Sequence, residues 1–233
     1  MREQTIDFAG YVASRPGAGF SEWLRASNRG LWADMVGHRF CHDMAADQLP
    51  DAVFIRYLRY EHAFVRGAIG IFAHALAKAP TPADQDHLIG VLVGLAGEQE
   101  AYFRRSFAAI GVDAEPLDPD KLPQAARGLR DAVVTIAAAD GFAEILAAML
   151  AAEWMYLTWC EEAHARGPQQ PGPLDWIELH LAADFRAQVT WLRRRLDELG
   201  PGLPATRQGR CADHFGRVLE LEIAFHEAPY AEA

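Results

Sequence analysis

The sequence predicts an all-α protein, and three observations support that class. Apolar residues recur at spacings of three and four over long segments, as in "AEILAAMLAAEWMYLTWCEEA" (143–163). The sequence lacks runs that alternate apolar and polar residues and are rich in β-branched side chains, which are typical of strands. Proline- and glycine-rich stretches divide the periodic segments into pieces of helical length. We therefore expect a single bundle of seven or eight helices.

Helix breakers place the expected elements in order. "RPGAG" (15–19) precedes the first helical stretch, Pro50 and Asp51 begin the second, and Gly111 ends the third. "RGPQQPGP" and "GPGLPATRQG" separate the last three. Helical stretches are expected at about 20–46, 50–79, 83–110, 123–139, 142–165, 174–199 and 211–226. "VDAEPLDPDKLP" (112–123) is interpreted as a connection within one domain, 1–233, whose residues 1–19 form an N-terminal extension.

Composition and charge exclude several classes of protein. The 233 residues carry a net charge of −10, which argues against a nucleic-acid partner and against anionic lipid. No apolar stretch reaches the roughly 18 residues of a membrane helix, and the N-terminus does not resemble a secretory signal. The three cysteines, Cys41, Cys160 and Cys211, are too scattered for a disulfide framework or a zinc site. We expect a cytoplasmic protein.

Three glutamates interrupt apolar helical rows. Glu61, Glu153 and Glu222 each stand at a position of a hydrophobic stripe where leucine would be expected. An unpaired carboxylate in a protein interior costs several kcal/mol. One such acid is most often satisfied by a nearby Arg, Tyr or backbone group. Three in one helical bundle favour a shared polar pocket built from facing side chains.

A carboxylate-rich iron site is the alternative interpretation of the same acids. His180 and Asp184 are spaced i, i+4 within one expected helix, and Glu61, Glu100 and Glu153 could add oxygen ligands. The ferritin-like pattern, however, requires Glu-x-x-His twice, and no histidine follows Glu100 at that spacing. We expect no metal or other cofactor, with iron as the alternative, and we interpret His180 as a hydrogen-bonded core histidine.

Cys160 and His164 are one helical turn apart, a spacing that permits a thiolate–imidazole pair. No recognisable oxyanion-stabilising device accompanies them in the sequence. A buried, unreactive cysteine is therefore the favoured interpretation.

Several motifs together resemble the TenA (thiaminase II) family. They are "WADMVGHRFCHDMAADQLPDAVFIRYLRYEHAFV", "GFAEILAAMLAAEWMYLTW", "WIELHLAADFRAQV" and "ELEIAFHEAPY". They occur in the family's order and span about residues 20–230. The resemblance implies the all-α fold shared with haem oxygenase and pyrroloquinoline-quinone synthase, assembled as a homodimer or homotetramer.

The resemblance also implies roles for individual residues. Glu61 matches the family's pyrimidine-binding aspartate, Glu222 its acid or base, and Tyr156 a pocket tyrosine. The nucleophilic cysteine of the family falls on Ala152, which has no nucleophile. Other pocket tyrosines of the family fall on Phe64, Leu129 and His180.

The missing cysteine makes the chain most similar to a Cys-less branch of the family. That branch is associated with thiamin salvage by hydrolysis of an amino- or formylamino-pyrimidine, so a small pyrimidine is the expected partner. Glu153, next to Ala152, could act as a general base for water. Of Glu153 and Glu222, one would remain protonated as the acid while the other activates water. Two alternatives remain: a di-iron or cofactor-free oxidase of the same fold, and a non-catalytic homologue that binds a small molecule.

Overall fold

The all-α class is confirmed. The computed structural model describes residues 7–112, 117–118 and 121–231, and these contain no β-strand. The helices are α1 (Phe8–Ser14), α2 (Phe20–Ser27), α3 (Arg29–Val36), α4 (Arg39–Ala45), α5 (Asp51–Lys78), α6 (Pro82–Gly94), the π-helix η1 (Leu95–Gln99), α7 (Glu100–Ala109), α8 (Gln124–Ala139), α9 (Phe142–His164), α10 (Pro171–Leu179), α11 (Ala183–Leu199), the 3-10 turn η3 (Gly200–Gly202) and α12 (Ala205–Ala231).

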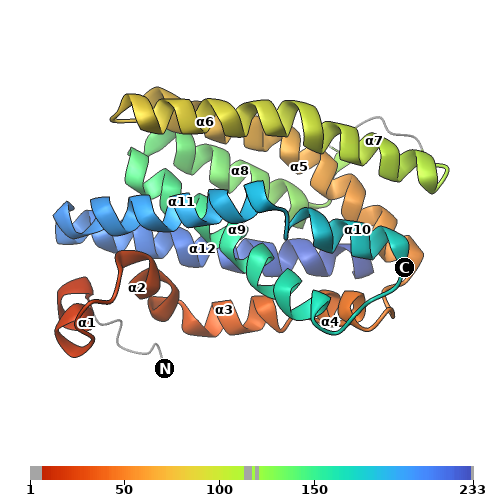
Figure 1. The fold of residues 1–233 in the computed structure, drawn as a ribbon, viewed down its shortest axis with the longest axis horizontal. Coiled ribbons are helices and arrows are strands. Elements are labelled where there is room, and N and C mark those ends of the chain that lie inside the picture. Colours follow the sequence, from red (N-terminus) through yellow and green to blue (C-terminus); the bar gives the residue numbers. More distant parts are fainter. Residues whose placement is uncertain (1–6, 113–116, 119–120, 232–233) are drawn as a thin grey trace.

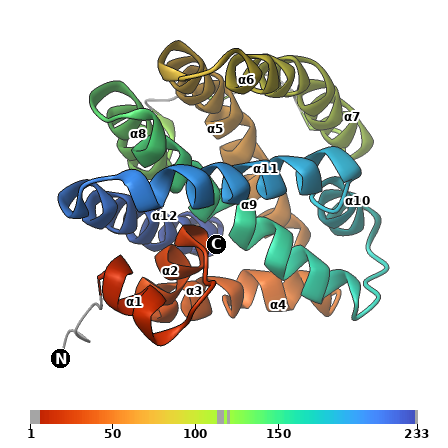
Figure 2. The same ribbon diagram turned by 60° about the vertical axis from the view of Figure 1, so that its left-hand side comes forward.

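The helices pack around α9, which crosses the interior of the bundle (Figures 1 and 2). Sixteen of its 23 residues are buried, as expected for a helix that is apolar all round. Its main neighbours are α12, α11, α4 and α10, while α8 lies between α5 and α12. The long hairpin of α5 with α6 and α7 closes one side of the bundle. None of the described helices combines the length and apolar character that a membrane crossing requires.

Three of the expected helical stretches are interrupted. Residues 20–46 form three short helices, with the Asn28 amide donating to the Leu24 and Ala212 carbonyl oxygens at 2.9 and 3.0 Å where α2 meets α3. Residues 83–110 change to π-helical geometry at 95–99. The described helices are therefore more numerous than the seven or eight expected.

The stretch 174–199 is interrupted at His180, which corrects one expectation about the site. His180 ends α10, and Asp184 lies in the first turn of α11. The two side chains therefore do not share a helix face. The His180 ring stabilises this end, because its Nδ1 lies 2.9 Å from the carbonyl oxygen of Trp176.

The N-terminal extension contributes to the core where it is described. Asp7 caps α1 by accepting a hydrogen bond from the Gly10 amide, 2.8 Å away. The Phe8 ring packs against Phe20 and Trp23, with centroids 5.1 and 5.7 Å apart. Residues 113–116 and 119–120 of the expected connection lie outside the described residues.

Candidate functional site

A cavity of about 940 Å³ lies between α5, α6, η1, α8, α9, α11 and α12. Most of its lining is apolar. Every site residue expected from the sequence borders it: Glu61, Phe64, Leu129, Ala152, Glu153, Tyr156, His180 and Glu222. The three glutamates of the apolar rows thus share one cavity.

Glu61 is held by two tyrosines. The Tyr156 hydroxyl donates a short hydrogen bond to Glu61 Oε1, and the Tyr57 hydroxyl lies 2.7 Å from that of Tyr156. Burial raises the pKa of Glu61 to about 7, although the hydrogen bonds from the tyrosines act to lower it. Burial and the nearby Glu61 charge raise the pKa of both tyrosines well above 10, so they remain neutral donors.

Glu222 on α12 is only 2% exposed. Its Oε2 has no hydrogen-bond partner among the described residues. Burial, with the charge of Glu61 as a second cause, raises the pKa of Glu222 well above its usual value. His226 lies 3.6 Å from Glu222, but burial lowers the pKa of His226 to about 3, so it supplies no positive charge. Burial therefore favours the protonated form of Glu222.

Glu153 faces the cavity with a single weak partner. The Gln188 amide donates to Glu153 Oε1 at 3.4 Å, and Glu153 Oε2 has no partner among the described side chains. Burial raises the pKa of Glu153 to about 8, and the bond from Gln188 acts against that rise. The carboxyl is therefore poised to lose a proton just above neutral pH.

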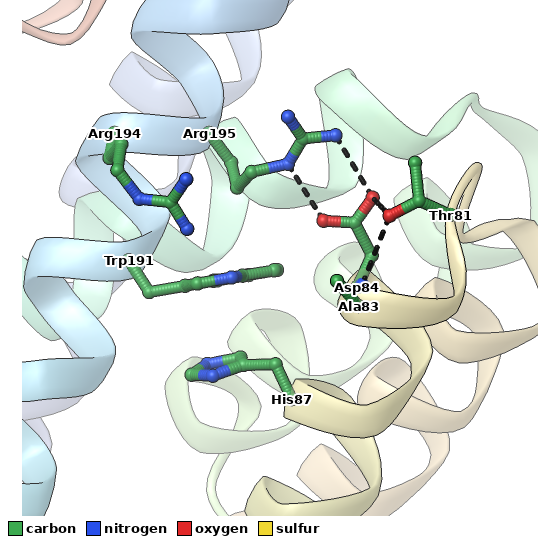
Figure 3. Close-up of a pocket in the computed structure, with 7 residues that line it drawn as sticks. All are labelled: Thr81, Ala83, Asp84, His87, Trp191, Arg194 and Arg195. Carbon is green, nitrogen blue, oxygen red and sulfur yellow. Dashed lines mark hydrogen bonds and ion pairs between the residues drawn. The ribbon is translucent and has the colours of Figure 1, made fainter.

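Gln188 is oriented in turn by His87. The His87 Nε2 lies 2.5 Å from Gln188 Oε1, which leaves the Gln188 NH₂ group to face Glu153. The His87 ring stacks on Trp191 with centroids 4.0 Å apart (Figure 3). Beside them, Arg195 forms an ion pair with Asp84, and its Nη2 donates to Asp84 Oδ2 at 2.9 Å. These contacts tie α6 to α11 and fix the outer end of the Glu153–Gln188–His87 chain.

His180 is a neutral wall of the cavity. Burial lowers the pKa of His180 to about 4, and its ring stacks on Tyr156 at 4.7 Å. Because Nδ1–H donates to the Trp176 carbonyl oxygen, Nε2 carries the lone pair. Ala152 adds only a methyl group to the cavity wall.

The described residues do not fit the alternative iron site. Glu100 is outside the cavity lining and pairs with His62 and Arg66, each at 3.2 Å. His180 caps the end of α10 and Asp184 begins α11, so the two are not one turn apart on a single helix, although both border the cavity. Among the residues that the structure describes, no group of three or more His, Cys, Asp and Glu side chains is arranged to hold a metal ion.

The cysteines offer no replacement nucleophile. Cys41, Cys160 and Cys211 are all buried, and none lines the cavity. Burial raises the pKa of the Cys160 thiol well above 9, which opposes formation of a thiolate beside His164.

Three residues of the site were not predicted from the sequence. Tyr57 precedes Glu61 by one turn, and this spacing could have identified it. Gln188 and His87 come from α11 and α6, and no local pattern connects them to Glu153.

Comparisons with solved structures show the fold. A TenA homologue from P. horikoshii OT3 superposes with a TM-score of 0.83 at 18% identity, covering 93% of this chain and all of the other. A candidate TenA-like thiaminase from Sulfolobus solfataricus P2 gives 0.77 at 16% identity, covering 92% and 97%. A domain of unknown function with a haem oxygenase-like fold from Shewanella denitrificans OS217 gives 0.67 at 15% identity, covering 90% and 91%.

Comparison with curated proteins finds no significant match. The profile of the TENA/THI-4/PQQC family, in contrast, matches residues 25–232, which is most of the sequence. The resemblance to TenA proteins is thereby confirmed, and the chain belongs to the TENA/THI-4/PQQC family.

Proposed function

We propose that the protein hydrolyses a C–N bond of an amino- or formylamino-pyrimidine, in thiamin salvage, without a cysteine nucleophile. One observation carries the proposal: Glu153 and Glu222 border the same cavity as the Tyr-bound Glu61, and both have an unpartnered carboxyl oxygen. Buried acids without a cationic partner are costly, and they are typical of functional sites.

Glu61 is suited to hold the pyrimidine. Its carboxylate can accept hydrogen bonds from an amino group on the ring, while Tyr156 fixes its orientation. Phe64 and Leu129 provide apolar surface for the faces of the heterocycle. The neutral His180 can accept a hydrogen bond through Nε2.

Glu153 and Glu222 are suited to divide the proton transfers. Ionised Glu153 takes a proton from water as the water oxygen bonds to the carbon. Protonated Glu222 gives its proton to the nitrogen as the C–N bond breaks, and the amine leaves. Ala152 leaves space for the water where the family has its cysteine. No covalent enzyme intermediate is needed.

The test is a product assay by mass spectrometry with thiamin, aminopyrimidine and formylamino-pyrimidine substrates. Pyrimidine turnover by the wild type, lost in both Glu153→Gln and Glu222→Gln, is the expected result. Full activity of Glu222→Gln would disprove the acid role. Tight pyrimidine binding without any product would instead indicate a non-catalytic binding protein.

A further inference from the structure

The cavity has two chemically different ends. The polar end holds Glu61, Tyr156 and Glu222, together with His180. Helices α6 and α11 and the π-helix η1 add further polar side chains along one side, whereas α5, α8 and α9 build an apolar end. The residues of this apolar end are Ile71, Phe72, Val133, Ile136, Ile145, Ala148 and Met149.

Helix directions explain the separation of the two ends. At one level, Tyr156 of α9 meets Glu61 of α5. Near the other, Lys78 at the end of α5 donates to the carbonyl oxygens of Ala137 and Asp140, at 2.7 and 2.6 Å, just before α9 begins. Hence α9 runs antiparallel to α5, whereas α8 runs parallel to α5. The apolar residues of all three helices therefore gather away from Glu61.

The apolar end is long enough for a substantial substituent. Glu61 and Phe72 are eleven residues apart on α5, which corresponds to about 16 Å along a helix. The volume of about 940 Å³ is near the top of the range of about 300–1,000 Å³ for sites that hold drug-sized ligands. A single pyrimidine ring at Glu61 leaves the apolar end unfilled.

The charges of the lining also constrain the ligand. The acidic residues that border the cavity are Glu61, Asp86, Glu98, Glu153, Asp184 and Glu222. No lysine or arginine is among the described lining residues. An anionic head group would therefore meet carboxyl groups without a compensating cation. A neutral or cationic head that donates hydrogen bonds is complementary to this lining.

We propose that the ligand is amphipathic, with a nitrogen-bearing head at Glu61 and an extended apolar tail along α5, α8 and α9. The identity of the head as an aminopyrimidine rests on the proposed function. The tail rests on the cavity alone. Burial of each additional methylene then contributes to affinity, by up to about fourfold per CH₂ group.

The tail is tested by calorimetric titration with n-alkylamines from butylamine to decylamine, and with alkanoates of the same lengths. Affinity for the amines is expected to rise with chain length. Each alkanoate is expected to bind at least about tenfold more weakly than the amine of the same length. Ala148→Phe, which fills the apolar end, should abolish the dependence on length while butylamine still binds. Ala148→Ser is the matched control, and Met149→Trp is a second filling variant if Ala148→Phe does not fold.

Each outcome decides the inference. Affinity that is independent of chain length, or a length dependence that survives both filling variants, would overturn the apolar tail. Tighter binding of alkanoates than of amines would overturn the nitrogen-bearing head. A length dependence accompanied by no pyrimidine hydrolysis would refute the proposed function and leave the amphipathic ligand supported.

Discussion

Glu144 and Glu153 lie on the same buried helix, yet their surroundings differ. Glu144 accepts two hydrogen bonds of 2.7 Å from the Arg207 guanidinium, whereas Glu153 has one contact of 3.4 Å from the neutral Gln188. Burial acts to raise the pKa of both. Arg207 reverses the effect at Glu144, whose pKa is lowered, while that of Glu153 rises to about 8. The fold thus can provide a cationic partner for a buried acid on α9, whereas the described residues that line the cavity include no lysine or arginine.

This difference distinguishes an acid with a structural role from an acid with a chemical role. A buried acid with a bidentate arginine stays ionised and exchanges no proton near neutral pH, and removal of either partner destabilises the native state. A buried acid without a cation costs stability when ionised, and it can exchange a proton near neutral pH. We therefore assign Glu144 to the packing of α9 against α12 and Glu153 to the chemistry of the cavity.

The largest expected effect is on turnover. Glu153→Gln should reduce pyrimidine hydrolysis by about 10²–10⁴-fold, the usual contribution of a positioned general base. Glu144→Gln, its matched control on the same helix, should leave kcat nearly unchanged at a temperature where the variant is folded. Turnover is measured by product formation. Equal losses of turnover in the two variants would contradict a catalytic role that Glu153 has and Glu144 lacks.

The second effect is on stability as a function of pH. The pKa of Glu153 is about 8 when folded and about 4.3 when unfolded, so the native state binds more protons between these values. Its contribution is therefore fully present below about pH 4 and is lost as pH rises through 8, on the order of a few kcal/mol. Denaturation of wild type and Glu153→Gln from pH 5 to 9 should show a shallower decline in the variant. Parallel curves would contradict the raised pKa.

The contribution of Glu144 to stability changes with pH in the opposite direction. Its pKa is lowered in the folded state, so its stabilisation is present above about pH 4.3 and is lost as pH falls through the folded pKa. Glu144→Gln should destabilise the protein by about 1–3 kcal/mol at pH 7, less than for a fully buried pair because Arg207 is 40% exposed. Urea denaturation measures this loss, and a neutral result would show that the pair is dispensable.

The smallest effect concerns Gln188. Gln188→Met removes the hydrogen bond that opposes the rise in the pKa of Glu153. Because Glu153 acts as a base, its pKa sets the rising limb of the pH–rate profile, and the inflection of that limb should move upward by up to about one unit, since a hydrogen bond contributes about 0.5–1.5 kcal/mol. Gln188→Glu would add a like charge and shift it in the same direction. A downward shift in Gln188→Met would contradict the assigned donor.

The sequence predicted the fold class and the three interior glutamates because both follow from helical periodicity, whereas the resemblance to the TenA family pointed to Phe64, Leu129, Ala152 and His180. Glu61, Glu153 and Glu222 interrupt apolar rows, so their place among apolar side chains was visible without coordinates. The interruption at His180 was not predicted, since no Gly or Pro marks it. Nor was the Gln188–His87 chain, which depends on how α6 and α11 meet. Tertiary contacts between distant helices leave no local signal.

The most direct test of the account is a pH titration of the glutamate carboxyl carbons by ¹³C NMR, with Glu153→Gln and Glu144→Gln used for assignment. We predict that the resonance missing in Glu153→Gln titrates with a midpoint near pH 8, and that the one missing in Glu144→Gln titrates below the usual value of about 4.3. A Glu153 midpoint near 4.3 would show a carboxylate that is already ionised at neutral pH. It would contradict the raised pKa of Glu153, and with it the difference between Glu153 and the arginine-paired Glu144.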